Sequence, residues 1–314
     1  MSRDFTVGKH FRIFPNRELG QGSFGKVYLA QDLRTNTLYA AKTESKSSKK
    51  SILEIESNVI RYVNQKLDMT PVIKNYWYGS DRKTNYLIID LLGPTLETLL
   101  RRSGGQFTLK TTLMIAEQMI NRIKYYHDRN IIHRDIKPDN FLLEVSSPRR
   151  DFYLIDFGLS KKYRSSTTKQ HIPYAEDRLH IGTARFMSVN AHAHKEQSRR
   201  DDMYSIGYII VYMLKGRLPW QGINERNKKM RYNRIHQLKD VTTNQELVDG
   251  IGCKNCIHRE VDCPGKQWVL NYFNYLDTLK FASEINYNFL LDGLITCMEK
   301  HEYSYDYEWD WDIV

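Results

Sequence analysis

The sequence lacks the features that mark several specialised classes of protein. It has no run of about 18 apolar residues, which a membrane-spanning helix would need, and residues 1–4 lack the apolar stretch of a secretory signal. It has four cysteines, three of them between positions 253 and 263, which do not make a secreted disulfide framework. No internal repeat is present. We therefore expect a reducing compartment: the cytoplasm, the nucleus or both.

Length, apolar content and charge indicate how many lobes to expect and what kind of partner the protein binds. With 314 residues and 41% hydrophobic residues, the chain exceeds one ordinary core, so we expect two lobes. Its 47 Lys and Arg outnumber its 37 Asp and Glu, and the formal net charge of +10 suits acidic partners. Nucleic acid is the rival partner, but no binding module and no interleaving of basic with aromatic residues supports it. We therefore favour acidic proteins over nucleic acid.

The stretch 133–140, His-Arg-Asp-Ile-Lys-Pro-Asp-Asn, is the most informative pattern in the chain, and Asp-Phe-Gly follows at 156–158. Phosphoryl transfer needs a carboxylate to orient a hydroxyl, a cation on the γ-phosphate and oxygens to hold magnesium. In this interpretation Asp135 takes the hydroxyl proton and Lys137 steadies the moving phosphoryl group. The chain therefore resembles a protein kinase. The expected magnesium ligands are Asn140 and Asp156.

A glycine-rich pattern lies upstream, where a kinase requires it. Gly20, Gly22 and Gly25 form Gly-x-Gly-x-x-Gly between the strand-like runs 11–19 and 27–31. Glycine lets backbone amides approach phosphate oxygens closely. The same pattern also fits a dinucleotide-binding fold, but there it should lead from a strand into a helix. Because strand-like residues follow here, we favour a hairpin that covers ATP.

A lysine and a glutamate are expected to form an ion pair beside the ATP site. The run 39–42 reads as a strand that ends in Lys42, which would grip the α- and β-phosphates; a solvated surface lysine is the alternative. Residues 51–63 carry apolar side chains at helical spacing. Within this helix Glu56 is the expected partner of Lys42, and Ile60, one turn on, should pack inward.

The two lobes should join after the apolar strand 86–90, where Gly93-Pro94 interrupts the chain. Backbone groups of Asp90 and Leu92 would bond the adenine edge. Helical patterns follow at 113–120 and 202–214, and Asp202 is expected to brace the catalytic loop. The other residues expected around ATP are Val27, Ala40, Ile89 and Leu142.

The downstream sequence resembles one kinase family in particular. The tripeptide Ala-Pro-Glu, which usually ends the activation segment, is absent after Asp156. In its place stands Gly-Thr-Ala-Arg-Phe-Met-Ser-Val-Asn at 182–190, followed by Glu-Gln-Ser-Arg-Arg-Asp-Asp-Met at 196–203. Together with Leu-Pro-Trp-Gln-Gly at 218–222, these resemble the casein kinase 1 family.

The resemblance covers about residues 11–311 and implies a bilobal α+β kinase fold over a single domain, 1–314. The N-terminal lobe, 1–90, would hold an antiparallel sheet with one main helix, and the C-terminal lobe, 91–314, would be mainly helical. It implies ATP with Mg²⁺ and transfer to Ser or Thr of acidic or already phosphorylated proteins. The catalytic set it implies is Lys42, Glu56, Asp135, Lys137, Asn140 and Asp156.

The resemblance also implies how substrate is read. Arg134, Lys161 and Arg178 match positions that form a basic pocket beside the activation segment, left open for an acidic or phosphorylated group. Arg185 and Arg231 match a second anion site near the peptide groove. A generic basic surface is the alternative for any one of these side chains.

The chain departs from the family at Tyr204, at 193–195 and, most clearly, at 253–265. The last stretch could supply a Cys₃His zinc set, since Cys-x-x-Cys is the spacing of one limb of such a site. A histidine only two residues after the second cysteine is poorly spaced to supply the second pair of zinc ligands, so we favour a loop of reduced thiols. The candidate zinc ligands are Cys253, Cys256, His258 and Cys263.

Two other classes stay open. A pseudokinase scaffold should have lost Lys42, Asp135 or Asp156, and all three are present. Tau-tubulin and vaccinia-related kinases share the overall pattern but should depart from the block 171–222. The sequence ends soon after the domain, so we expect a kinase without autoinhibition by a tail. The basic run 227–232 could be a nuclear address, although such runs are usually solvated faces.

Overall fold

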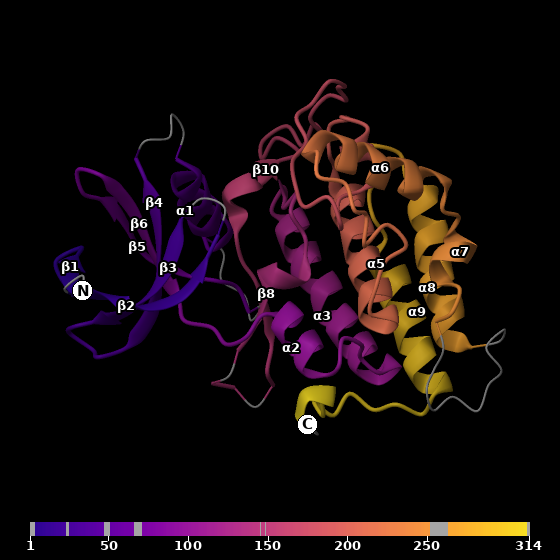
Figure 1. Ribbon diagram of the computed structural model, residues 1–314, viewed down its shortest axis with the longest axis horizontal. Helices are drawn as coiled ribbons and strands as arrows, with labels where there is room; N and C mark the ends of the chain where they lie inside the picture. The colour runs from indigo at the N-terminus through magenta and orange to yellow at the C-terminus, as the bar shows by residue number, and fades with distance from the viewer. Residues whose placement is uncertain are drawn as a thin grey trace.

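The computed structural model describes residues 4–22, 25–46, 51–65, 71–144, 146–147, 149–251 and 263–312. The chain forms a strand-rich N-terminal lobe and a larger helical C-terminal lobe, as Figure 1 shows. The expected bilobal α+β fold is confirmed, whereas the expected boundary between residues 90 and 91 stays a prediction. None of the described helices is both long and apolar enough to cross a membrane.

The N-terminal lobe is a six-stranded antiparallel sheet in the order β1-β2-β3-β4-β6-β5. Alternation along each strand places apolar side chains such as Ile13, Ala41 and Ile88 on the buried face. The register aligns Val27 with Lys42, so the strand after the glycine pattern lies beside the lysine. The strands are β1 (Phe5–Val7), β2 (Phe11–Gln21), β3 (Lys26–Asp32), β4 (Leu38–Ser45), β5 (Asn75–Ser80) and β6 (Thr84–Asp90).

Helix α1 (Ile52–Val63) packs against this sheet, and its first turn is tied to β4. Ser51 caps the helix by accepting from the Glu54 amide at 3.0 Å. Glu44 of β4 is buried and accepts from the Ile52 amide at 2.8 Å. A carboxylate at a helix N-terminus is favourable because the amides there have no partner within the helix. These bonds fix how α1, which carries Glu56, sits on the sheet.

The C-terminal lobe is built around α3 (Leu109–Asp128) and α5 (Arg199–Lys215), two largely buried helices that pack on each other. Two small sheets hold the catalytic loop on the face toward the N-terminal lobe. One pairs β7 (Ile131–Ile132) with β10 (Lys161–Lys162), and the other pairs β8 (Phe141–Leu143) with β9 (Phe152–Leu154). The remaining helices are α2 (Leu96–Arg102), α4 (Val189–His192), α6 (Lys228–Val241), α7 (Asn244–Val248), α8 (Pro264–Asp277) and α9 (Tyr287–Lys300), with 3₁₀ turns η1 (Pro138–Asn140), η2 (Phe157–Leu159) and η4 (Asp310–Asp312).

A segment that we call the C-terminal strap, residues 303–312, crosses beneath α2 and α3 (yellow in Figure 1). Asp310 accepts from the amide and hydroxyl of Thr108, the N-cap of α3, at 2.6 and 2.8 Å. Trp309 is only 1% exposed and stacks on Trp311 with ring centroids 4.9 Å apart. It also meets the ring of Phe152 edge-on at 6.3 Å. The strap therefore completes the apolar core between α3 and β9.

Candidate active site

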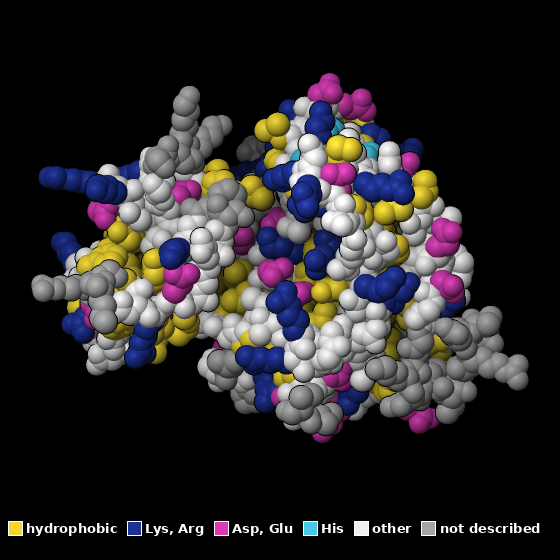
Figure 2. Space-filling view, viewed as in Figure 1, with side chains coloured by type: hydrophobic (Ala, Val, Ile, Leu, Met, Phe, Trp, Pro, Cys, Tyr) yellow, Lys and Arg dark blue, Asp and Glu magenta, His cyan; other side chains and the backbone are white. Residues whose placement is uncertain are grey.

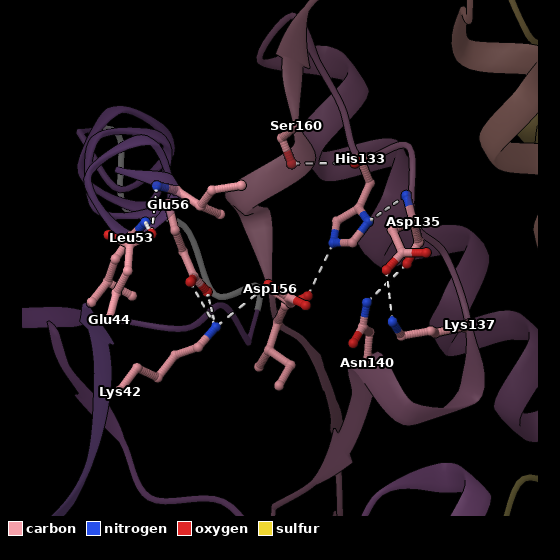
Figure 3. Close-up of polar contacts among 12 residues, drawn as sticks. Lys42, Glu44, Leu53, Glu56, His133, Asp135, Lys137, Asn140, Asp156 and Ser160 are labelled. Atoms are coloured by element: carbon pink, nitrogen blue, oxygen red, sulfur yellow. Dashed lines mark hydrogen bonds and ion pairs between the residues drawn. The ribbon is translucent and has the colours of Figure 1, made fainter. Parts of the chain in front are cut away.

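Three charged side chains from three elements meet between the lobes (Figure 3). Lys42 of β4 donates to both carboxylate oxygens of Glu56 on α1, at 2.8 and 2.6 Å. Its ammonium also lies 3.5 Å from Asp156. Burial alone would lower the pKa of Lys42, but the two carboxylates outweigh burial and raise its pKa above the usual value. The expected pairing of Lys42 with Glu56 is present, and the lysine stays a cation.

A second polar group, on the catalytic loop, surrounds Asp135 (Figure 3). Lys137 donates to one carboxylate oxygen of Asp135 at 2.7 Å, and the hydroxyl of Thr183 donates to the other, also at 2.7 Å. The amide of the Asn140 side chain donates to the Asp135 carbonyl at 2.8 Å. The Asp135 carboxylate is therefore held from two sides, with its orientation set before any substrate arrives.

Buried Asp202 of α5 braces this loop from below, as expected from the sequence. It accepts from the amides of His133 and Arg134 at 2.7 and 2.8 Å, and from Nε2 of His127 at 2.9 Å. Burial would raise the pKa of Asp202, but the bonds and charges of the histidines lower it overall, so the carboxylate stays ionised. These bonds support Arg134, whose φ of 69° is costly for a residue other than glycine.

The three residues of the Asp-Phe-Gly triplet, 156–158, lie beneath the start of α1. Asp156 has a left-handed backbone, with φ 69° and ψ 64°. Phe157 is fully buried against the rings of Tyr126 and His133. A Cβ at Gly158 would lie 2.2 Å from the Ile52 side chain, so only glycine fits beneath the start of α1. The Phe157 side chain thus fills the core while the Asp156 carboxylate faces Lys42.

A small cavity lies at the glycine-rich hairpin, in the region expected to hold ATP. This cavity, of about 60 Å³, is lined by Gly22, Gly25, Lys42 and Asp156, among others. A Cβ at Gly25 would come within 1.7 Å of a β4 backbone oxygen, so the close approach of the two strands requires glycine. The lining of the cavity includes residues expected to meet the phosphates of ATP, and phosphate binding there stays a prediction. Three larger cavities, of about 830, 710 and 270 Å³, lie elsewhere in the described part of the chain.

The residues expected around adenine come from several elements, among them β4 and β6. Ala40 and Ile89 are buried and paired across β4 and β6. The Asp90 carboxylate is engaged within the N-terminal lobe, since it accepts from the Lys74 amide and the Tyr76 hydroxyl. Their contacts with adenine, like those of Gly20, Val27, Leu92 and Leu142, stay predictions.

The donor set suits magnesium better than a metal caged by protein ligands alone. Among the described residues, no group of three His, Cys, Asp or Glu side chains gathers as a metal site. Asp156 keeps 31% of its side chain exposed, so its carboxylate is open to a cation. Magnesium usually takes one or two protein oxygens and completes its shell with water and phosphate. The exposed carboxylate of Asp156 fits that pattern, and Asn140 as the second ligand stays a prediction. Cys253, Cys256 and His258 lie outside the described residues, and Cys263 is the buried N-cap of α8.

Three of the expected anion-binding residues surround one buried acid, and we call this group the Glu196 cluster: Arg134, Lys161, Arg178 and Glu196. Glu196 is 4% exposed and accepts from Lys161 at 2.9 Å and from Arg178 at 3.0 Å. Arg134 lies near enough for its charge to interact with Glu196. Arg134 also interacts with Asp202, so three cations face two carboxylates and leave an excess of one positive charge. Figure 2 shows Lys and Arg side chains gathered on this lobe beside the cleft.

The second expected anion site is less defined. Arg185 lays its guanidinium over the rings of Phe186 and Tyr212, at 5.7 and 5.5 Å. Arg231 is exposed on α6. Their role as an anion site stays a prediction.

Sequence reasoning missed Thr183 and Glu196, although both lie within the patterns quoted for the family resemblance. Thr183 is 48 residues from Asp135, and Glu196 is 35 residues from Lys161. Neither contact follows from local periodicity. The one available signal was their place in a block of unusually specific sequence.

A sequence model of the protein kinase domain matches residues 15–259 of the chain. That span covers most of the chain, including the glycine pattern, the Lys42–Glu56 pair and the catalytic loop. The chain belongs to the protein kinase family, whose members generally use ATP and Mg²⁺.

Proposed function

We propose that the protein is a serine/threonine kinase of casein kinase 1 type. It would transfer the γ-phosphate of ATP, with Mg²⁺, to Ser or Thr of acidic or already phosphorylated proteins in the cytoplasm, the nucleus or both. The observation that carries the substrate preference is the Glu196 cluster, a basic site anchored by its own carboxylate. Because Glu196 already orders Lys161 and Arg178, the cluster keeps its shape without a phosphate on the chain itself.

The geometry supports a division of labour among the polar residues. Lys42, oriented by Glu56, would bind the α- and β-phosphates. Asp135 would accept the proton of the substrate hydroxyl, and Lys137 would compensate negative charge on the γ-phosphoryl group. Asp156 and Asn140 would hold Mg²⁺, which when bound offsets charge on the phosphates. A phosphate or acidic side chain in the Glu196 cluster would fix the peptide so that its hydroxyl reaches Asp135.

Replacing Lys161 and Arg178 together by glutamate is expected to act selectively on primed substrate. For a peptide with phosphoserine about three residues before the target residue, kcat/KM should fall. The fall should correspond to about 1–3 kcal/mol of lost transition-state stabilisation, because charge-assisted hydrogen bonds are removed. For an unprimed peptide, kcat/KM should change little. The measurement is a set of steady-state assays on matched primed, acidic and unprimed peptides.

Lys162→Glu is the matched control, because this exposed neighbour of Lys161 lies over the ring of Tyr62 rather than against Glu196. It reverses one positive charge outside the cluster, where the double variant reverses two within it. Equal losses on primed and unprimed peptides in the double variant would mean that the cluster is structural and does not read phosphate.

Phosphatase treatment is expected to leave peptide phosphorylation as fast as before. The loop hydroxyls of Ser165, Ser166, Thr167 and Thr168 are not needed to order the Glu196 cluster. Without any phosphate, the Tyr62 hydroxyl of α1 already lies 3.1 Å from that of Ser166. Initial rates before and after treatment, with removal of phosphate checked by mass spectrometry, test this. A large loss that rephosphorylation restores would indicate a conventional activation loop instead.

A further inference from the structure

The end of the activation segment forms a tight turn, residues 183–187, whose backbone is held from outside. Within the turn, the Thr183 carbonyl accepts from the amides of Phe186 and Met187, both at 2.9 Å. The carbonyls of Ala184, Arg185 and Met187 instead accept from side chains of other elements. Buried carbonyl groups need such partners, so the partners determine where the turn can sit.

Lys239 of α6 supplies two of these bonds. Its Nζ donates to the carbonyls of Ala184 at 3.1 Å and Met187 at 2.5 Å. The residue is only 4% exposed, and its Nζ lies 4.6 and 4.7 Å from the ring centroids of Tyr208 and Trp220. Within the described part of the chain no carboxylate pairs with it, and burial lowers its pKa well below the usual range. A lysine buried in this way is costly, and either protonation state can still donate both bonds.

Two further side chains complete the hold on the turn. Trp220 donates from Nε1 to the Arg185 carbonyl at 2.8 Å, and His192 of α4 lies with Nε2 3.1 Å from the Ala184 carbonyl. Burial lowers the pKa of His192 to about 3, so at neutral pH its ring is uncharged and Nε2 serves as the donor. Lys239 is the member of this group that spans the turn, because it bonds both Ala184 and Met187.

The other side of the turn touches the catalytic loop. A Cβ at Gly182 would lie 2.6 Å from the Arg134 carbonyl, so the two segments approach closely only because this residue is glycine, with φ 111°. The next residue, Thr183, donates its hydroxyl to Asp135 at 2.7 Å. A shift of the turn would therefore move the hydroxyl that orients the Asp135 carboxylate.

We propose that Lys239 is a positioning residue that holds the turn at 183–187 so that Thr183 orients Asp135 beside the acceptor peptide. The inference rests on the proposed function, since it concerns the placement of a peptide hydroxyl. Lys239 would touch no reacting atom and would act only through the turn. Misplacement by about 1 Å at a reacting centre can lower a rate by roughly 100-fold, so a rigid support matters.

Lys239→Met removes both donors while keeping an unbranched side chain of similar length, and Lys215→Met is its control. Lys215 of α5 also donates to two backbone carbonyls, those of Leu247 and Asp249, but away from the active site. We expect kcat/KM for peptide to fall roughly 10- to 100-fold in Lys239→Met only. Nucleotide affinity, measured with a fluorescent ATP analogue, should stay unchanged in both variants. A parallel loss of nucleotide affinity, or unchanged peptide kinetics, would overturn the inference.

Amide hydrogen exchange adds a measurement that needs no turnover. The amides of Phe186 and Met187 should exchange faster in Lys239→Met than in the parent or in Lys215→Met. If Lys239→Met does not fold, Trp220→Phe should speed the same amides, because it removes the bond to the Arg185 carbonyl and shrinks the ring that lies beside Lys239. Unchanged exchange in a folded variant overturns the role of the turn contacts. Failure of the parent protein to phosphorylate any peptide, with exchange altered as expected, would overturn the proposed function alone.

Discussion

Asp156→Asn and Asp135→Asn are each expected to lower kcat by several orders of magnitude with the fold intact. Asp156 carries the carboxylate that faces Lys42, at 3.5 Å, and would hold the metal that offsets phosphate charge. Asp135 is held by Lys137 and Thr183 in one orientation, and its amide counterpart could not take the hydroxyl proton. Steady-state assays at saturating ATP and peptide, with circular dichroism to check folding, measure both effects.

Asp139→Asn is the matched control, because Asp139 lies in the same loop but is exposed to solvent. It removes one negative charge four residues from Asp135 and should retain most of the turnover. Near-normal kcat in Asp135→Asn or Asp156→Asn would contradict the catalytic roles assigned to these two carboxylates, and with them the kinase mechanism proposed here.

Trp309→Ala is expected to lower the free energy of unfolding by about 3–5 kcal/mol. The Trp309 side chain is 1% exposed and packs against the rings of Trp311 and Phe152, so truncation leaves a cavity beneath α3. Nothing in the active site contacts this residue directly, and the expected loss is one of stability. Urea titration followed by intrinsic fluorescence and by circular dichroism tests it, and the two signals should agree if unfolding is cooperative.

Glu308→Gln serves as the control from the same strap, because the Glu308 side chain is 81% exposed. A surface change of this kind should stay within about 0.5 kcal/mol. If Trp309→Ala had the same free energy of unfolding as Glu308→Gln, the strap would add little to the stability of the C-terminal core.

Much of the site could be predicted because phosphoryl transfer places rigid demands on short stretches of sequence. Residues 133–140 and the triplet at 156–158 are such short stretches. The structure places Asp156 of the triplet beside Lys42, which pairs with Glu56. The helix expected over 51–63 is present as Ile52–Val63, with Ser51 as its cap. Local periodicity and capping chemistry were sufficient there.

The missed contacts share a different character. Glu196, Thr183 and Lys239 act through partners that are distant in sequence, and each partner is a backbone group or a charge that periodicity does not mark. The Lys239–Met187 bond spans 52 residues, and one of its two atoms belongs to the backbone. Burial of a lysine is also contrary to the usual preference of that residue, so its sequence alone would suggest a solvated side chain.

The position of the C-terminal strap in the sequence has a consequence for how the protein is made. The N-terminal sheet is complete once β6 ends at Asp90, but the core between α3 and β9 needs Trp309. At synthesis rates of about 5–20 residues per second, the ribosome reaches Trp309 on the order of 8 to 30 seconds after Phe152. During that interval the apolar surface around Phe152 is uncovered in the nascent chain. This lobe should therefore depend on molecular chaperones during translation more than the sheet does.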